Sequence, residues 1–364
     1  MNKLTEYIER LRSEGAFNEF SSDHILIKAI KNDDEAIKRF CKWTPCDGFY
    51  EPNALSFVSN FSQKMGYLSS VFGHNEIVEF IKVQLSAGKS NYDEKTFIQA
   101  LSEIEILFFL IRWCGKVLDA QYEPRQNEAR NPEAQIKYND TIVINIEVKT
   151  PKFDELTIDD GFNGIIQPNV CLDRSNLDKF KKILSVNKFQ INWPKVCKIK
   201  DFINSAVGKF NSVDHKTQFN VLCINYSCSP WNDVALDEPE ALLLNPSSGI
   251  LVNEKIRETL EISKRIDNIS AFIIYKTNSQ SLLFTDIRTC LQRVYLIPNP
   301  LCPNLDLEPL QQHLQLRKLE PLPLVSDFSL FSWAMRNNYE FTNAVRMEIE
   351  KLLSKNIGID VISF

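Results

Sequence analysis

The chain has 364 residues, of which 44% are hydrophobic and 24% charged, and its formal net charge is −5. This composition is that of an ordinary soluble globular protein with a sizeable core. The negative charge excludes a strongly basic coat for nonspecific nucleic-acid binding, although it allows a local basic groove. The N-terminus lacks an apolar signal region, no apolar run reaches membrane-spanning length, and the nine cysteines favour reduced thiols. We therefore expect a cytoplasmic protein that does not contact a membrane.

Residues 1–95 are predicted to form an N-terminal helical module. Apolar residues recur at helical spacing in three stripes, which begin at Leu4, Ile25 and Ile77. The sequence of this module does not state its function. We expect it to contribute recognition of a target or of a protein partner.

Residues 96–300 are predicted to form one α/β domain. A longer helix from 96 to 115 is apolar on nearly all sides, so it should be mostly buried. The later elements are expected in this order: a strand at 116–122, a hairpin at 132–149, helices at 176–184 and 198–210, a strand at 219–226, a helix at 252–267, and strands at 271–275, 282–285 and 294–297. Residues 153–169 have turn composition. This order favours a mixed sheet flanked by helices.

Residues 301–364 are predicted to be a C-terminal extension. Prolines cluster from Pro298 onward, which is typical of a wrapped connector and not of a second core. A closing helix is expected at 338–355.

The hairpin is the most informative stretch. Its even-numbered strand positions are apolar from Ala134 to Val148, whereas its odd-numbered positions are polar except for Val143. The two apolar rows share a face only if opposed residues have numbers of the same parity. This requires a three-residue or bulged loop near 139–140, because a two-residue loop would give the opposite parity.

That register places Glu133 opposite Glu147, and Lys149 projects from the same side. Opposed carboxylates repel unless something neutralises them, and a divalent cation is a common solution. Mg²⁺ prefers oxygen ligands and is often held by one or two carboxylates plus substrate phosphate. Such an ion would polarise a phosphoryl oxygen, while Lys149 would position or activate the attacking water. We therefore expect a Mg²⁺ site that also accepts Mn²⁺.

These residues resemble the PD-(D/E)xK nuclease superfamily, which has the restriction-endonuclease-like fold. Its pattern is a Pro-Asp pair at the start of one strand and an acidic-x-Lys triplet in the next, matched here by Pro132-Glu133 and Glu147-Val148-Lys149. The family commonly has a glutamate on the helix before the sheet, a place that Glu103 matches best, with Glu105 as the alternative. The resemblance covers about 98–226. It departs from the family pattern at Glu133, where Asp is usual.

The resemblance implies a role for each matched residue. Glu133 and Glu147 would bind Mg²⁺, with the Val148 carbonyl as a further ligand. Lys149 would be the catalytic lysine, and Glu103 would support a bound water or a second ion.

Several lysines are candidates for contact with nucleic acid. Lys209 matches a helical position at which the family often carries a Gln or Lys near the site. Lysines and aromatic residues also alternate between 179 and 200, which favours a groove that follows a nucleic-acid backbone, or equally the polar side of two helices. The lysines expected to bind nucleic acid are Lys152, Lys182, Lys188 and Lys209.

The resemblance implies a Mg²⁺-dependent nuclease that hydrolyses phosphodiester bonds of DNA, an endonuclease of a bacterial defence or restriction type. Restriction-like nucleases often cut both strands as dimers, so we expect a homodimer. Two alternatives stay open: a catalytically inactive protein of the same fold that binds nucleic acid or a protein partner, and an RNA-cleaving nuclease. The simplest interpretation of the hairpin is a solvated face on which Glu147 and Lys149 form a surface salt bridge.

Overall fold

The computed structural model describes residues 13, 24–33, 35, 54–85, 94–114, 116–124, 131–150, 160–168, 178, 181–182, 184–186, 188–191, 195–225, 242–244, 249–276, 292–314, 317–318, 331–335 and 351. The chain divides into two compact units. The first comprises Met1–Lys152, Gly208–Pro230 and Asp267–Leu319, and the second comprises Phe153–Val207, Trp231–Ile266 and Glu320–Phe364.

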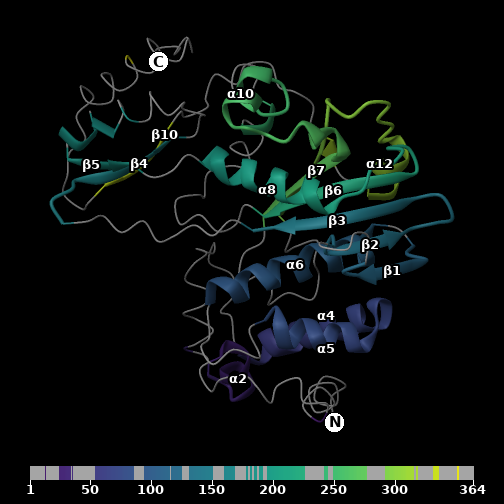
Figure 1. Cartoon of the computed structure of the whole chain (residues 1–364). Helices are drawn as coiled ribbons and strands as arrows, with labels where there is room; N and C mark the ends of the chain where they lie inside the picture. The colour runs from purple at the N-terminus through teal and green to yellow at the C-terminus, as the bar shows by residue number, and fades with distance from the viewer. Residues whose placement is uncertain are drawn as a thin grey trace. The chain divides into compact units, whose positions relative to one another are not determined.

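A seven-stranded mixed sheet, in the order β1-β2-β3-β6-β7-β8-β9, belongs to the first unit (Figure 1). Strands β1 to β3 are antiparallel, β3, β6 and β7 are parallel, and β8 is antiparallel to β7 but parallel to β9. The strands span Asp119–Tyr122 (β1), Ala134–Lys137 (β2), Val143–Lys149 (β3), Gln218–Asn225 (β6), Ala271–Lys276 (β7), Gln292–Pro298 (β8) and Arg317–Lys318 (β9). The prediction of a mixed α/β fold is confirmed.

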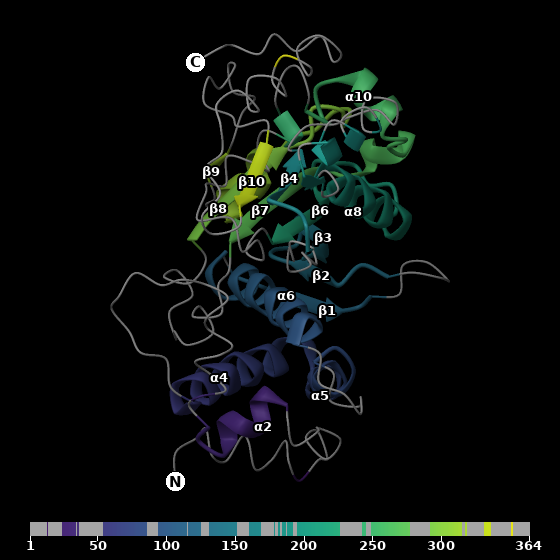
Figure 2. The same ribbon diagram turned by 90° about the vertical axis from the view of Figure 1, so that its left-hand side faces the viewer.

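Helix α6 (Glu94–Trp113) lies between this sheet and the N-terminal helices, as Figures 1 and 2 show from two directions. The sheet covers one side of α6, and α4 (Ala54–Phe72) contacts another, so the helix is buried on nearly all sides, as expected. Two shorter helices, α2 (Ile25–Ile30) and α5 (His74–Val83), pack against α4. A last helix, α12 (Glu308–Leu314), accepts a hydrogen bond from Cys114 Sγ at Leu314 O.

These helices and the sheet share one hydrophobic core. Residues 1–95 are therefore not set apart as a unit of their own, because an all-apolar α6 needs cover on both sides. Among the described helices, none is both long enough and apolar enough to cross a membrane.

The hairpin has the predicted register. Opposed residues of β2 and β3 have numbers of the same parity, as in the pair Ala134–Ile146. A three-residue loop, 139–141, lies between Tyr138 and Ile142, whose backbone groups are hydrogen-bonded at 3.0 Å. The Asn139 Oδ1 accepts a hydrogen bond from Ile142 N at 2.7 Å, an arrangement that favours a tight turn. The odd loop is confirmed, and with it the face on which each side chain lies.

The second unit contains a three-stranded sheet, in which β4 (Gly164–Pro168) is antiparallel to β10 (Phe331–Met335) and parallel to β5 (Phe189–Ile191). Helix α10 (Glu254–Thr259) begins after Asn253, whose side chain caps it by accepting a hydrogen bond from Ile256 N. Helix α8 (Lys195–Lys209) begins in the second unit and ends in the first.

Two expectations for single elements differ from the structure. Residues 164–168 form β4 and not a turn, because their strand partner lies far away in sequence, in β10. The single helix expected at 252–267 is α10 followed by the 3₁₀ helix η1 (Lys264–Asn268), and Glu261 between them has a positive φ of 53° that interrupts an α-helix.

The C-terminal region is more than a connector, since it supplies α12, β9 and β10. It is also divided between the two units, as is 96–300, so the observed division differs from one at residues 95 and 300. The expected strand 282–285 lies outside the described residues, as does the closing helix 338–355 apart from Lys351, which is helical.

Candidate active site

The polar face of the hairpin is buried. On the face away from α6, Glu147 is 0% exposed and Asn145 is 3% exposed. One step beyond the Ala134–Ile146 pair, the ladder brings Glu133 across from Glu147. The interpretation of the hairpin as a solvated face, on which Glu147 forms a surface salt bridge, is therefore wrong.

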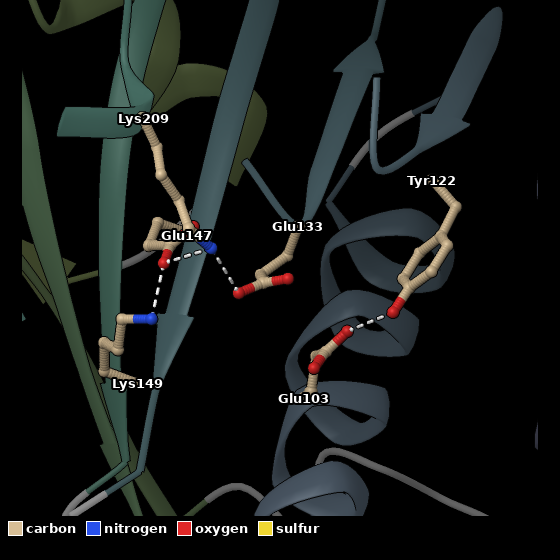
Figure 3. A network of polar contacts seen from close by, with 6 residues as sticks. All are labelled: Glu103, Tyr122, Glu133, Glu147, Lys149 and Lys209. Atoms are coloured by element: carbon tan, nitrogen blue, oxygen red, sulfur yellow. Dashed lines mark hydrogen bonds and ion pairs between the residues drawn. The ribbon is translucent and has the colours of Figure 1, made fainter. Parts of the chain in front are cut away.

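Two lysines meet the buried carboxylate (Figure 3). Lys149 Nζ lies 2.6 Å from Glu147 Oε1, and Lys209 Nζ lies 2.8 Å from the same atom. Lys209 Nζ also donates a hydrogen bond to Glu133 Oε1 at 3.1 Å. The last residue of α8 thus links two carboxylates that come from the two strands of the hairpin.

One oxygen of Glu147 has no such partner. Its Oε2 is buried and has no hydrogen-bond partner among the described residues, whereas the two ammonium groups both approach Oε1. A buried carboxylate oxygen in this state is costly, because it has lost water and gained nothing in exchange.

The charges of the site work against one another. Burial raises the pKa of Glu147 and the charge of Glu133 raises it further, while Lys149 and Lys209 act in the opposite direction. Burial opposes the charge of Lys209, yet Glu133 and Glu147 raise its pKa, so this side chain remains an ammonium group. An additional positive charge near Glu147 would lower its pKa toward the ordinary range.

Glu103 approaches the site from α6. Its Oε1 accepts a hydrogen bond of 2.9 Å from the hydroxyl of Tyr122 in β1 (Figure 3). Burial and then the charge of Glu133 raise the pKa of Glu103 well above its ordinary value, and the bond from Tyr122 lowers it. The Tyr122 ring makes edge contacts with Phe72 and Phe80, with ring centroids 5.9 and 5.7 Å apart.

Glu105, the alternative to Glu103, has a different partner. Its Oε1 pairs with Lys64 Nζ of α4, and both side chains are buried. Burial raises the pKa of Glu105, and Lys64 counteracts the shift. This ion pair joins two helices, so Glu103 and not Glu105 is the glutamate of α6 at the site.

The donor set fits a hard divalent cation. Glu133 and Glu147 face one another, and Glu147 Oε2 is a buried oxygen without a hydrogen-bond partner. Val148 turns its side chain to the opposite, apolar face, so only its backbone carbonyl is available as a ligand. No group of three or more His, Cys, Asp or Glu is arranged to hold a metal within the described part of the chain. Two carboxylates suffice for Mg²⁺, which keeps several waters and completes its shell with substrate phosphate.

The other candidate lysines lie outside the first unit or outside the described residues. Lys182 and Lys188 are exposed residues of the second unit, and Lys152 lies outside the described residues. Phe189 is one of the aromatic residues of the predicted nucleic-acid groove. It is only 2% exposed, so it cannot stack on a base.

Sequence reasoning missed Tyr122 and Glu123. The sequence pattern of residues 116–122 indicates only a strand, and the signal for Tyr122 is its even number, which it shares with its partner Ala134 on the α6 side of the sheet. Glu123, at the end of β1, has a positive φ of 43°, and its N–H donates a hydrogen bond to Glu133 O at 2.8 Å. Partial burial and then the charge of Glu133 raise the pKa of Glu123, as expected for carboxyl groups that lie close together.

No model of a known protein family, no curated protein and no solved structure matches the chain. The functional argument therefore depends on the geometry and charge of the site itself.

Proposed function

We propose that the protein is a Mg²⁺-dependent nuclease that hydrolyses phosphodiester bonds, with DNA as the favoured substrate. One observation carries the proposal: two opposed glutamates and a lysine converge at the end of the hairpin, and the more buried glutamate keeps an oxygen without a hydrogen-bond partner. Glu105 Oε2 also lacks a partner, but at Glu147 a second carboxylate and two partly exposed lysines lie beside the oxygen, and a divalent cation would supply its missing partner.

In this proposal each residue of the site has its own role in hydrolysis. Glu133 and Glu147 hold the ion, which when bound supplies Lewis-acid polarisation of a phosphoryl oxygen. Lys149, at 2.6 Å from Glu147 Oε1, orients the attacking water and stabilises negative charge as it develops on the phosphate. Glu103, held by Tyr122, adds a carboxylate on the α6 side of the site.

The order of elements supports the same proposal. Within the first sheet and its helices the order is a glutamate-bearing helix α6, the antiparallel strands β1 to β3, helix α8 and the parallel strand β6, with β4 and β5 of the second unit between β3 and α8. This is the order that the resemblance to the restriction-endonuclease-like fold implies. A role in bacterial defence and a homodimer rest on that analogy alone.

A second candidate is a protein that binds nucleic acid or a protein partner without cutting. The observation that favours it is Lys209, whose ammonium group already neutralises Glu133 and Glu147. If these ion pairs are permanent, the carboxylates serve stability and the lysines are not free for a substrate.

A cleavage assay separates the two candidates. Supercoiled plasmid, linear duplex, single-stranded DNA and RNA are incubated with Mg²⁺, Mn²⁺ or EDTA. The nuclease predicts product with either metal and none with EDTA, and the substrate that is cut decides between DNA and RNA. Metal-independent binding in a gel shift, with no product on any substrate, would establish the second candidate instead.

Matched variants assign the activity to the site. Glu147→Gln and Lys149→Met keep side-chain size and should each slow cleavage by about 10²–10³-fold. Asp140→Asn is the control, because Asp140 lies at the turn of the same hairpin with its side chain 94% exposed. Equal product from Glu147→Gln and Asp140→Asn would refute the assignment.

A further inference from the structure

Lys209 occupies the position from which a cation would join the two carboxylates. Its Nζ lies 2.8 Å from Glu147 Oε1 and 3.1 Å from Glu133 Oε1, and Figure 3 shows the ammonium group directed at both. Lys149 differs, since within the described residues it forms an ion pair with Glu147 and none with Glu133. The two lysines therefore carry the same charge, but Lys209 contacts both carboxylates and Lys149 contacts one.

An ion bound to the same oxygens would exclude the Lys209 ammonium group. Mg²⁺ takes its oxygen ligands at about 2.0–2.1 Å. An ion that takes Glu133 and Glu147 as ligands would lie close to the Lys209 ammonium group, which is in ion-pair contact with both carboxylates. Two positive charges at such a separation also repel strongly in a buried site.

The Lys209 side chain can move away from the carboxylates without any movement of α8. It is the last residue of α8, and Phe210 beside it is 1% exposed, which fixes the backbone at this point. The Lys209 side chain itself keeps 18% of its surface exposed, compared with 0% for Glu147. A lysine carries its charge on a flexible four-carbon stem, so the ammonium group can leave the carboxylates while the helix stays in place.

We propose that Lys209 is a displaceable counterion: it competes with the divalent cation for Glu133 and Glu147, and ion binding releases its ammonium group to a phosphate of the nucleic acid. This inference rests on the proposed function, because it requires that the carboxylates bind a metal. It means that the metal-free site is closed by an internal ion pair and that metal binding opens it for the substrate.

Calorimetric titration of the full chain with Mn²⁺, without nucleic acid, tests the competition. Lys209→Met removes the charge and keeps the stem, and Lys149→Met is the matched control, since it removes an equal charge from Glu147 Oε1. A contact formed in about 90% of molecules lowers apparent affinity about tenfold, so Lys209→Met should bind Mn²⁺ roughly tenfold more tightly than wild type. Lys149→Met should gain clearly less.

A second measurement uses only the wild-type chain. The acylation rate of Lys209, followed by mass spectrometry, should rise severalfold when Mg²⁺ is added, while that of exposed Lys182 stays constant. Equal affinity gains in the two variants, or a Lys209 rate that Mg²⁺ does not change, would overturn the displacement. If instead neither wild type nor variants bind metal or cut, the proposed function itself fails, so the two failures are distinguishable.

Discussion

Two glutamates of the first unit are equally buried but differ in their surroundings. Glu105 of α6 pairs with one lysine, Lys64 of α4, and the two side chains are 1% and 3% exposed. Glu147 of β3 is 0% exposed, but Lys149 and Lys209 beside it keep 22% and 18% of their surface exposed. In both glutamates, Oε2 is buried without a hydrogen-bond partner among the described residues.

The difference separates a structural ion pair from a candidate active site. Lys64 lies in the helical core, where its Nζ is also 5.9 Å from the centre of the Phe108 ring, so this pair offers a ligand no route of approach. The lysines at Glu147 retain contact with solvent, and a second carboxylate, Glu133, faces the same point. Buried charge alone therefore does not distinguish the two sites; the partly exposed counterions and the second carboxylate do.

The largest expected effect is on stability, at Glu105. Glu105→Gln leaves Lys64 charged and buried, which should lower the free energy of unfolding by about 3–5 kcal/mol. Replacing both residues, as Glu105→Leu with Lys64→Met, should recover most of the loss. Chemical denaturation measures both. A loss below about 1 kcal/mol for Glu105→Gln would remove the contrast with Glu147.

Mg²⁺ should stabilise the folded protein by binding at Glu147 and not at the Glu105–Lys64 ion pair. At a concentration about 100 times its dissociation constant, Mg²⁺ should raise the free energy of unfolding by about 2.7 kcal/mol in wild type. The same concentration should have no effect on Glu147→Gln, because that variant lacks a carboxylate ligand. Thermal unfolding with and without Mg²⁺ measures this, and an unchanged shift in Glu147→Gln would show that the ion binds elsewhere.

The pH dependence of stability should also distinguish Glu147. Its pKa in the folded state is raised above the ordinary 4.5, so the folded state holds a proton that the unfolded state releases. The stability that this proton provides is present below pH 4.5 and is lost as pH rises through the raised pKa.

The comparison with Glu147→Gln isolates this effect from other titrating groups. Wild type should lose about 1.4 kcal/mol relative to the variant for each unit by which the pKa is raised. Denaturation at pH 5 and pH 8, without metal, measures the difference. Parallel pH profiles of wild type and Glu147→Gln would contradict the raised pKa.

The smallest expected effect on stability concerns the hydrogen bond between Tyr122 of β1 and Glu103 of α6. Tyr122→Phe removes the hydrogen bond to Glu103 but keeps the ring contacts, so it should cost about 1 kcal/mol of stability. Tyr138→Phe is the matched control, because the Tyr138 hydroxyl donates to Leu110 O at 2.8 Å in the core. Both variants should lose similar stability, but only Tyr122→Phe should also slow metal-dependent cleavage.

The sequence predicted the parts of the site that depend on local pattern. The parity of the apolar rows determined the loop length, and the loop length determined that Glu133 lies opposite Glu147. The all-apolar pattern of α6 likewise predicted its burial. Strand alternation and helical periodicity are properties of short segments, so they can be read without knowing the rest of the fold.

The remaining features depend on contacts between distant segments. The pairing of β4 with β10 and the approach of Lys209 to Glu133 join residues far apart in sequence, and no periodicity encodes them. The choice between Glu103 and Glu105 also required the position of Lys64 on another helix. Lys209 was matched only through the resemblance to a family, and the structure brings its side chain to the carboxylates.

The most direct test of the central claim is the initial rate of plasmid cleavage by Glu147→Gln and Glu105→Gln, each normalised to folded protein and measured with Mg²⁺ and with EDTA. The account predicts that Glu105→Gln cuts at the wild-type rate and that Glu147→Gln is slower by about 10²–10³-fold, the cost of losing one electrostatic group in an active site. Equal rates in the two variants, or cleavage that persists in EDTA, would contradict it.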